Sequence, residues 1–192
     1  MYSYLEVMKK IFSLFLGVAL LLGVFSPALA QDMESSPSAD VQGTSEEVEE
    51  IKSVELFWPV VAGKTMGDPL YFLKSAKEKV RGWFISGKAK KADYEMLLAT
   101  KRVVEAEKLL MDGKEDLAIK TLNKAEASVE KSRNYWTDVE NKGDKPDIMI
   151  NIKNQLSNIE VFLNYFESKN EGSVKEKING LNKKVVDFII SF

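Results

Sequence analysis

The 192-residue chain has an ordinary globular composition, with 45% hydrophobic and 29% charged residues and a formal net charge of −2. It contains no cysteine and no histidine. The chain therefore lacks disulfides, a thiolate nucleophile and an imidazole general base, and zinc, copper and haem sites are disfavoured. We expect no cofactor.

Residues 1–30 have the three parts of a secretory signal peptide. Lys9 and Lys10 form a positive start, residues 11–25 are uncharged and rich in Leu, Val and Phe, and Ala28 and Ala30 fit a signal-peptidase site. The apolar run is short beside the roughly 20 residues that span a membrane. We expect cleavage after Ala30 and an extracytoplasmic protein, secreted or held in the cell envelope. The alternative is an uncleaved anchor, which would be the protein's only contact with a membrane.

Residues 31–55 are expected to form an acidic, disordered linker. Seven acidic and no basic residues occur between Asp32 and Glu50, and Ser, Pro, Gly and Thr fill most of the rest. Such a stretch buries too little apolar surface to offset its ordering entropy. From Ile51 onward 25 basic and 21 acidic residues give a net charge of +4. A spacer, or alternatively an autoinhibitory arm, thus precedes a mildly basic domain over residues 56–192.

An apolar stretch, residues 56–61, opens this domain. Pro59 and Gly63 disfavour a helix there, so we expect an extended segment. Its aromatic residues Phe57 and Trp58 would fill a groove of the domain, or alternatively form an exposed motif for a partner.

Five helical segments are expected to follow, the first three over residues 68–140. Asp68 and Pro69 are typical of a helix start. The apolar face of the first helix is Leu70, Leu73, Ala76, Val80 and Phe84. The second helix, residues 88–111, and the third, from about residue 114, carry seams with 4-3-4-3-4 spacing, as in coiled coils. Joined by a tight turn at Gly113, these seams predict a long central antiparallel hairpin. Their members are Ala92, Met96, Ala99, Val103, Ala106 and Leu110, and Ala118, Leu122, Ala125, Val129, Ser132 and Trp136.

A C-terminal helix pair is expected over residues 146–192. Pro146 opens the fourth helix, and Ser173 with Glu176 predicts a capping box for the fifth. No alternating strand pattern of useful length occurs. The sequence therefore predicts an all-α antiparallel bundle of about five helices. The two apolar faces are Ile148, Ile152, Leu156, Ile159, Leu163 and Phe166, and Val174, Ile178, Leu181, Val185, Phe188 and Ile189.

Residues 69–74, at the start of the first helix, read Pro-Leu-Tyr-Phe-Leu-Lys, and this start resembles a bacterial domain-of-unknown-function family of exported, helix-rich proteins. That family has a Pro-Leu-Tyr-x-Leu-Lys helix start, matched by residues 69–74, and then a hairpin rich in Lys/Arg, Glu and Ala. The resemblance covers roughly residues 57–131 and leaves the last two helices outside. It implies the fold and the compartment, and it brings no activity, ligand or catalytic residue. The hairpin residues that carry it are Glu78-Lys79, Leu98-Ala99, Lys101-Arg102, Glu105-Ala106-Glu107, Leu109-Leu110, Gly113-Lys114 and Leu117-Ala118.

Residues 109–125 also resemble one tetratricopeptide hairpin. Those repeats stack in arrays of about three, and no second copy occurs in register.

Catalytic chemistry would have to rely on carboxylates, and Glu105 with Glu107 is the pair to consider for glycoside hydrolysis. Two residues apart on a helix, their side chains point in different directions. We assign both to solvated positions beside Lys101 and Lys108 and expect no enzyme.

No metal site and no nucleic-acid site is expected elsewhere in the chain. The acidic segments 112–116 and 141–147 lack the spacing of a calcium loop, so no metal site is expected. The basic group Lys88, Lys90 and Lys91 is interpreted as a solvated helix end, with weak attraction to anionic lipid or wall polymer as the alternative. It is too small a patch to predict nucleic-acid binding. The aromatic residues Tyr71, Trp83 and Trp136 are assigned to the core or its edge.

The leading hypothesis is a non-enzymatic exported protein that binds or scaffolds an unidentified envelope protein or polymer. The alternatives are a carboxylate-based hydrolase acting on wall glycan and a self-associating structural module. The sequence leaves the oligomeric state open. The candidate interaction surface consists of Phe57, Trp58, Lys88, Lys90 and Lys91.

Overall fold

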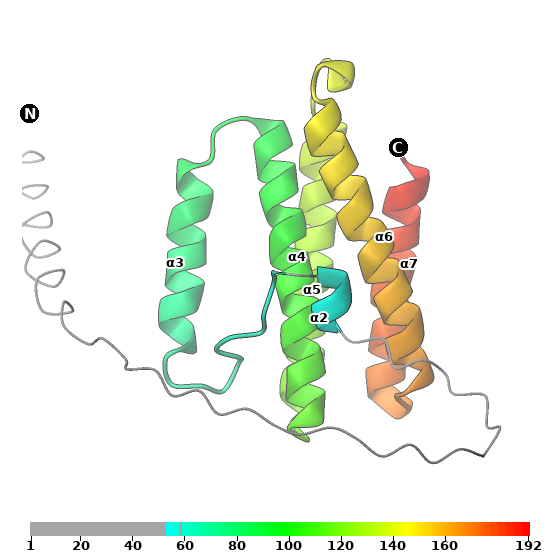
Figure 1. Ribbon diagram of the computed structural model, residues 1–192. Helices are drawn as coiled ribbons and strands as arrows, with labels where there is room; N and C mark the ends of the chain where they lie inside the picture. Colours follow the sequence, from blue (N-terminus) through cyan, green and yellow to red (C-terminus); the bar gives the residue numbers. More distant parts are fainter. Residues whose placement is uncertain (1–52, 58) are drawn as a thin grey trace, which may run out of the picture. The chain divides into compact units, whose positions relative to one another are not determined.

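The computed structural model describes residues 53–57 and 59–192, and their regular secondary structure is entirely helical (Figure 1). No strand occurs in this part of the chain, so the predicted all-α bundle is confirmed. The predicted signal peptide, with Ala28 and Ala30, and linker residues 31–52 lie outside the described residues. The elements are α2 (Ser53–Phe57), α3 (Tyr71–Phe84), α4 (Lys88–Met111), α5 (Glu115–Thr137), the 3-10 turn η1 (Lys142–Asp144), α6 (Pro146–Ser168) and α7 (Gly172–Ile190).

The predicted hairpin is formed by α4 and α5, the most extensively packed pair of helices in the described part. All residues of the two seams are buried except Leu110, which is half-buried. Small alanines in both seams let the helix backbones approach closely. Ser132, the one polar seam residue, donates its hydroxyl proton to the Ala92 carbonyl at 2.7 Å, so its burial leaves no unsatisfied group.

The turn between α4 and α5 has the geometry predicted for a glycine stop. Gly113 has a φ of 70°, a left-handed conformation that glycine adopts without steric cost. The Lys114 N–H donates to the Leu109 carbonyl at 2.8 Å and the Gly113 N–H to the Leu110 carbonyl at 2.9 Å. These two bonds form a Schellman motif, which reverses the chain tightly enough for the seams to face each other.

The C-terminal pair completes the core, with α6 packed on α4 and α7 and α7 packed on α5. The predicted faces are buried, apart from half-buried Ile148 and Ile189. The predicted capping box is wrong, because α7 begins at Gly172 with Glu171 in the capping position and no side-chain hydrogen bond there. Ser173 therefore lies inside the first turn.

The start of the domain differs from the prediction. Ser53–Phe57 form α2, so the last three residues of the predicted linker 31–55 belong to a helix, and Leu56 and Phe57 are not extended. Pro59 follows the helix and does not interrupt it. The Phe57 ring packs edge-on against Phe162, with centroids 5.7 Å apart, and the Leu56 carbonyl accepts a hydrogen bond from Asn158 at 2.9 Å. Trp58 lies outside the described residues.

Helix α3 has the opposite orientation to the one predicted. It begins at Tyr71, after a turn in which the Asp68 carboxylate accepts the Leu70 N–H at 2.8 Å. Its predicted core face is exposed, whereas Tyr71 and Glu78 on the other face are buried. The physical reason is that α3 contacts the hairpin through charged side chains, as the next section describes. Figure 1 shows α3 alongside α4, at the edge of the bundle.

None of the helices within residues 53–57 and 59–192 is both long enough and apolar enough to cross a membrane.

Candidate functional site

A cluster of alternating charges attaches α3 to α4. Lys74 and Glu78 lie four residues apart on α3, and Arg102 and Glu105 three apart on α4, so each pair faces the other helix. One oxygen of Glu105 accepts hydrogen bonds from Lys74, at 2.5 Å, and from Arg102. Arg102 also pairs with Glu78. Four side chains from two helices thus form one continuous ion network.

Glu105 is fully buried in this network, so its predicted solvated position is wrong. Burial is tolerated because Lys74 and Arg102 compensate the charge. Burial raises the pKa of Glu105, and the nearby cations Arg102 and Lys74 oppose that increase. Glu107, two residues on, is half-buried and accepts a hydrogen bond from Ser53 of α2. The two carboxylates therefore do point in different directions, as predicted.

Lys74 also connects α3 to the segment that precedes it. Its ammonium group donates to the carbonyl oxygens of Ala62 at 2.8 Å and Lys64 at 2.9 Å, in addition to Glu105. All three of its protons therefore have acceptors.

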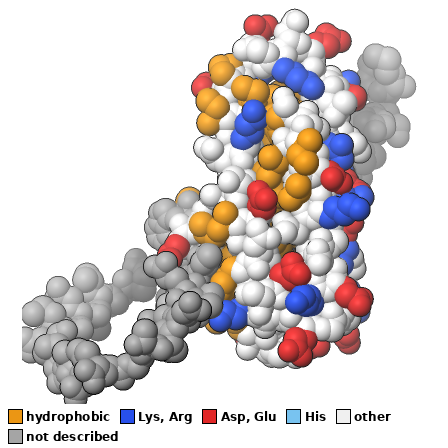
Figure 2. Space-filling model, turned by 90° about the vertical axis from the view of Figure 1, so that its right-hand side faces the viewer, with side chains coloured by type: hydrophobic (Ala, Val, Ile, Leu, Met, Phe, Trp, Pro, Cys, Tyr) orange, Lys and Arg blue, Asp and Glu red, His pale blue; other side chains and the backbone are white. Residues whose placement is uncertain are grey.

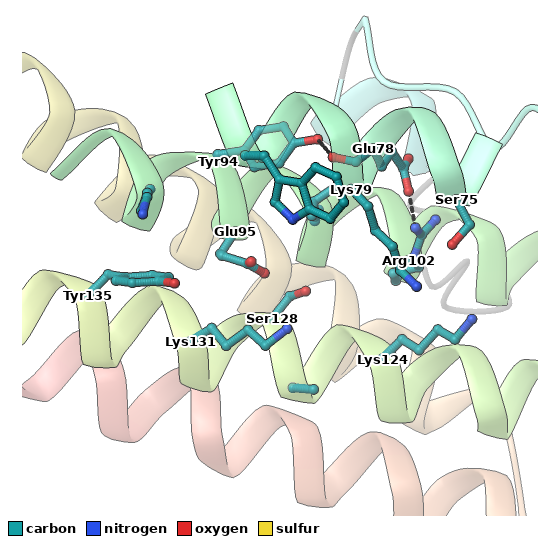
Figure 3. A pocket seen from close by; sticks show the side chains of 15 residues that line it. Ser75, Glu78, Lys79, Tyr94, Glu95, Arg102, Lys124, Ser128, Lys131 and Tyr135 are labelled. Carbon is teal, nitrogen blue, oxygen red and sulfur yellow. Dashed lines mark hydrogen bonds and ion pairs between the residues drawn. The ribbon is translucent and has the colours of Figure 1, made fainter. Parts of the chain in front are cut away.

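A groove of about 790 Å³ lies between α3 and the α4–α5 hairpin, beside the ion network. In Figure 3, Glu78 and Lys79 approach it from α3, and Lys124 and Lys131 from α5. The hydroxyl of Tyr94 donates to the Glu78 carbonyl at 2.8 Å, which fixes the back of the groove. Its lining residues on α5 run from Lys124 to Tyr135, about 16 Å at the rise of an α-helix.

The groove is basic. Its cations are Lys79, Lys91, Arg102, Lys124 and Lys131, and its acids are Glu78 and Glu95. Arg102 and Glu78 compensate each other, so four lysines face the single carboxylate of Glu95. None of these four lysines forms an ion pair in the described part of the chain.

Lys124 and Glu95 have the most unusual environments in the groove. The Lys124 ammonium group donates to the Tyr71 hydroxyl at 3.4 Å and has no carboxylate partner among the described residues. Burial lowers the pKa of Lys124, and the neighbouring Arg102 lowers it further. The Glu95 Oε2 atom is buried and, among the described residues, has no hydrogen-bond partner. The groove thus offers positive charge for an anion and a free acceptor for a hydroxyl or amide proton.

The structure separates the predicted interaction residues. Lys91 lines the groove, with its ammonium 5.8 Å from the Tyr135 ring centroid. Lys88 and Lys90 line a different depression of about 380 Å³, where Lys88 pairs with Asp138 at 3.2 Å. Phe57 is in the core, and Trp58 is outside the described residues.

Of the three aromatic residues assigned to packing, two are placed as predicted. Tyr71 is buried beneath Lys124, whose ammonium lies 5.0 Å from the ring centroid. Trp136 is buried against Phe192. The third prediction is wrong, because Trp83 is 81% exposed and lines the rim of the groove.

Sequence reasoning missed most of the groove. Lys124, Ser128, Lys131 and Tyr135 repeat at 4-3-4 spacing, the same period as the buried seam of α5. That second stripe was a usable signal, since it predicts a single polar face beside the seam. The ion network was also present among the residues that carry the family resemblance, which include Lys74, Glu78, Arg102 and Glu105.

The residues that line the groove lie within a region matched by a protein-family model. A family model described as "Domain of unknown function (DUF5667)" matches residues 63–179. The match covers α3 to α6 and the first part of α7, so it extends beyond the residues 57–131 that suggested the resemblance and includes much of the last two helices. No curated protein and no solved structure matches the chain.

Proposed function

The chain belongs to the DUF5667 family of domains of unknown function, and we propose that it is a non-enzymatic binding module of the cell envelope. Its ligand site is the groove between α3 and the α4–α5 hairpin. The ligand is an anionic polymer that carries phosphate or carboxylate groups together with hydroxyls.

Four lysines without acidic partners in one groove are the observation that carries this proposal. Surface lysines on ordinary helices are interspersed with acids, whereas Lys79, Lys91, Lys124 and Lys131 face a shared space. An anionic ligand would neutralise the repulsion among them. The buried acceptor on Glu95 and the ring of Tyr135 suit a hydroxyl-bearing chain, because sugars and polyols supply both donors and apolar C–H faces.

A polymer fits better than a small ion. The lining extends over three turns of α5, longer than one phosphate or one sugar residue requires. A repeating anion would place successive charges along Lys124 and Lys131, which lie seven residues apart on one face of the helix.

Binding without catalysis is supported by the position of the acids. Glu105 is enclosed by Lys74 and Arg102, and Glu78 is paired with Arg102, so neither carboxyl group is available to move a proton for a ligand in the groove. Glu95 is then the one remaining acid among the described residues that line the groove, whereas glycoside hydrolysis by carboxylates uses a pair. Export is supported by the sequence of residues 1–30, and the N-terminus of the protein recovered from envelope fractions should be Gln31.

Calorimetric titration with three polymers of matched length tests the proposed chemical class of the ligand. Poly(glycerol phosphate) supplies phosphates, polygalacturonate supplies carboxylates, and dextran supplies hydroxyls without charge. We expect one or both polyanions to bind and dextran not to bind. The Lys124→Ala/Lys131→Ala variant should lose about tenfold or more in affinity.

The matched control is Lys175→Ala, an exposed lysine of α7, which should leave affinity unchanged. The polyanion that binds shows whether the charged group of the ligand is a phosphate or a carboxylate. Absence of binding to both polyanions, or equal affinity in the Lys124→Ala/Lys131→Ala variant, contradicts the proposal.

A further inference from the structure

The side of α3 opposite its contacts with α4 is a continuous apolar surface, and it meets the rim of the groove at Trp83. Six residues, Phe72, Leu73, Ala76, Val80, Trp83 and Phe84, fall within an arc of about 120° when the helix is viewed along its axis. All six are exposed, Phe72 by 63%, Trp83 by 81% and Phe84 by 83%. We call these six residues the apolar face of α3.

The apolar face lies opposite the charged contacts that hold the helix in place. Tyr71, Lys74 and Glu78 point toward α4 and α5, where the ion network has its partners. Turning α3 to bury its apolar face would therefore break the salt bridges to Arg102 and Glu105. The helix is fixed with its polar side inward, and its aromatic side chains have no partner among the described residues of the bundle core.

Positive charge borders the apolar face on both sides. Lys77 and Lys79, both exposed, lie just beyond its two edges, and exposed Arg81 follows. The only acid in α3 is Glu78, which is turned inward and paired with Arg102. A second copy of this helix would bring lysines against lysines, so the charges select a partner with a negative surface.

The opposite side of the molecule has a different character. Figure 2 shows the side on which α6 and α7 lie in Figure 1, where acidic and basic side chains alternate and apolar side chains form separate groups. Among the described residues, the exposed aromatic side chains are Phe72, Trp83 and Phe84, all on α3.

We propose that α3 docks the protein on an anionic lipid surface, lying in the plane of the interface with Phe72, Trp83 and Phe84 inserted between the headgroups. A helix with Trp, Phe and Leu on one face and Lys and Arg beside it is the type that binds such interfaces, through buried apolar area and attraction to anionic lipids. This extends the sequence expectations, which allowed membrane contact through an uncleaved signal segment and a weak attraction of the Lys88, Lys90 and Lys91 group to anionic lipid.

The test uses a chain from Gln31 to Phe192, so that the apolar signal segment cannot bind vesicles itself. Every buried core residue of the described structure lies between Phe57 and Phe188, so this chain retains the whole core. Co-sedimentation is measured with vesicles of phosphatidylcholine alone and with vesicles containing phosphatidylglycerol in equal parts.

We expect binding to the phosphatidylglycerol vesicles, weakened by added salt. The Phe72→Ser/Phe84→Ser variant should bind about tenfold or more weakly. Circular dichroism verifies its folding, and Met111→Ser/Ile190→Ser, which removes two equally exposed apolar side chains elsewhere, should bind as the original does. The Lys124→Ala/Lys131→Ala variant of the groove should also keep its vesicle binding, which separates this proposal from the preceding one.

A fluorescence measurement shows which part of the protein contacts the lipid. Brominated lipid should quench tryptophan fluorescence in the bound protein, and Trp83→Phe should remove most of the quenching while binding persists. Absence of binding to the anionic vesicles, or unchanged binding by Phe72→Ser/Phe84→Ser, overturns the proposal. So does dimerisation in light scattering that this variant abolishes, because it would assign the apolar face to a second copy.

Discussion

At the scale of single residues, Lys74 joins three parts of the protein. It donates to two carbonyl groups of the preceding segment and to the buried Glu105. Removing one partner of a buried ion pair leaves an uncompensated charge, at a typical cost of about 3–5 kcal/mol. We predict that Lys74→Met lowers the free energy of unfolding by about 3 kcal/mol, measured by urea denaturation.

The control for Lys74→Met is Lys77→Met on the same helix. Lys77 is exposed and has no ion pair in the described residues, so this change should shift the free energy by no more than about 0.5 kcal/mol. Equal effects of the two substitutions would contradict the role assigned to Lys74.

The lowered pKa of Lys124 gives ligand binding a defined pH dependence. Burial and Arg102 favour its neutral form, so Lys124 loses its proton at a lower pH than an ordinary lysine. Affinity for a polyanion should be full near neutrality and fall at alkaline pH, before the ordinary lysine pKa of about 10.4 is reached. Lys124→Arg keeps the positive charge and should remove this early decrease. Titrations at increasing pH, compared between the two proteins, check it, and coinciding profiles would refute it.

Helical periodicity in the sequence predicted the environment of some residues correctly and of others wrongly. Ser132 and Trp136 were placed correctly because the seam period fixes which side of α5 they occupy. The burial of Glu105 was not predicted, because an acidic residue next to apolar seam residues is normally exposed to solvent. Its burial depends on Lys74, 31 residues earlier, and helical periodicity gives no information about such a long-range partner.

At the scale of elements, the α4–α5 hairpin depends on its small residues. Ala125 is fully buried in the seam, so a larger side chain there would force the helices apart. Overpacking of this kind costs about 1–3 kcal/mol. We predict a loss in that range for Ala125→Leu by urea denaturation. Ala127→Leu, at an exposed position of the same helix, should be nearly neutral, and equal losses would contradict the close packing.

Helix α3 should be the least stable of the long helices. Its contacts to the hairpin are ion pairs, hydrogen bonds and the Tyr71 ring, and its apolar residues bury little surface. Local opening is easiest where few apolar contacts are lost. We predict that the amides of α3 exchange with deuterium about tenfold or more faster than those of central α5. Equal exchange rates in the two helices would contradict the conclusion that α3 is held mainly by polar contacts.

The existence of α3 was predictable, and its orientation was not. An apolar stripe at helical spacing shows that a helix is amphipathic, but it does not identify what the stripe faces. Leu73, Val80 and Phe84 have the same pattern as a core helix. The informative signal was on the other side, where Lys74 and Glu78 match Arg102 and Glu105 in charge.

At the scale of the whole molecule, the hairpin and the C-terminal pair form the core, and α3 adds two surfaces to it. Its inner side closes a basic groove, and its outer side is the apolar face. Both proposals depend on this orientation, because a rotation of α3 about its axis would remove the groove and bury the apolar face together.

The chain's lack of cysteine allows a direct test of that orientation. Single cysteines are introduced by Leu73→Cys, Val80→Cys, Phe84→Cys and, as a buried control, Ala125→Cys, and the rate of maleimide labelling is compared with that of each unfolded chain. The structure predicts that the three α3 cysteines react nearly as fast as when unfolded, while the cysteine at position 125 reacts about 100-fold more slowly. Protection at positions 73, 80 and 84 as strong as at position 125 would show that this face is buried, and would contradict the orientation of α3.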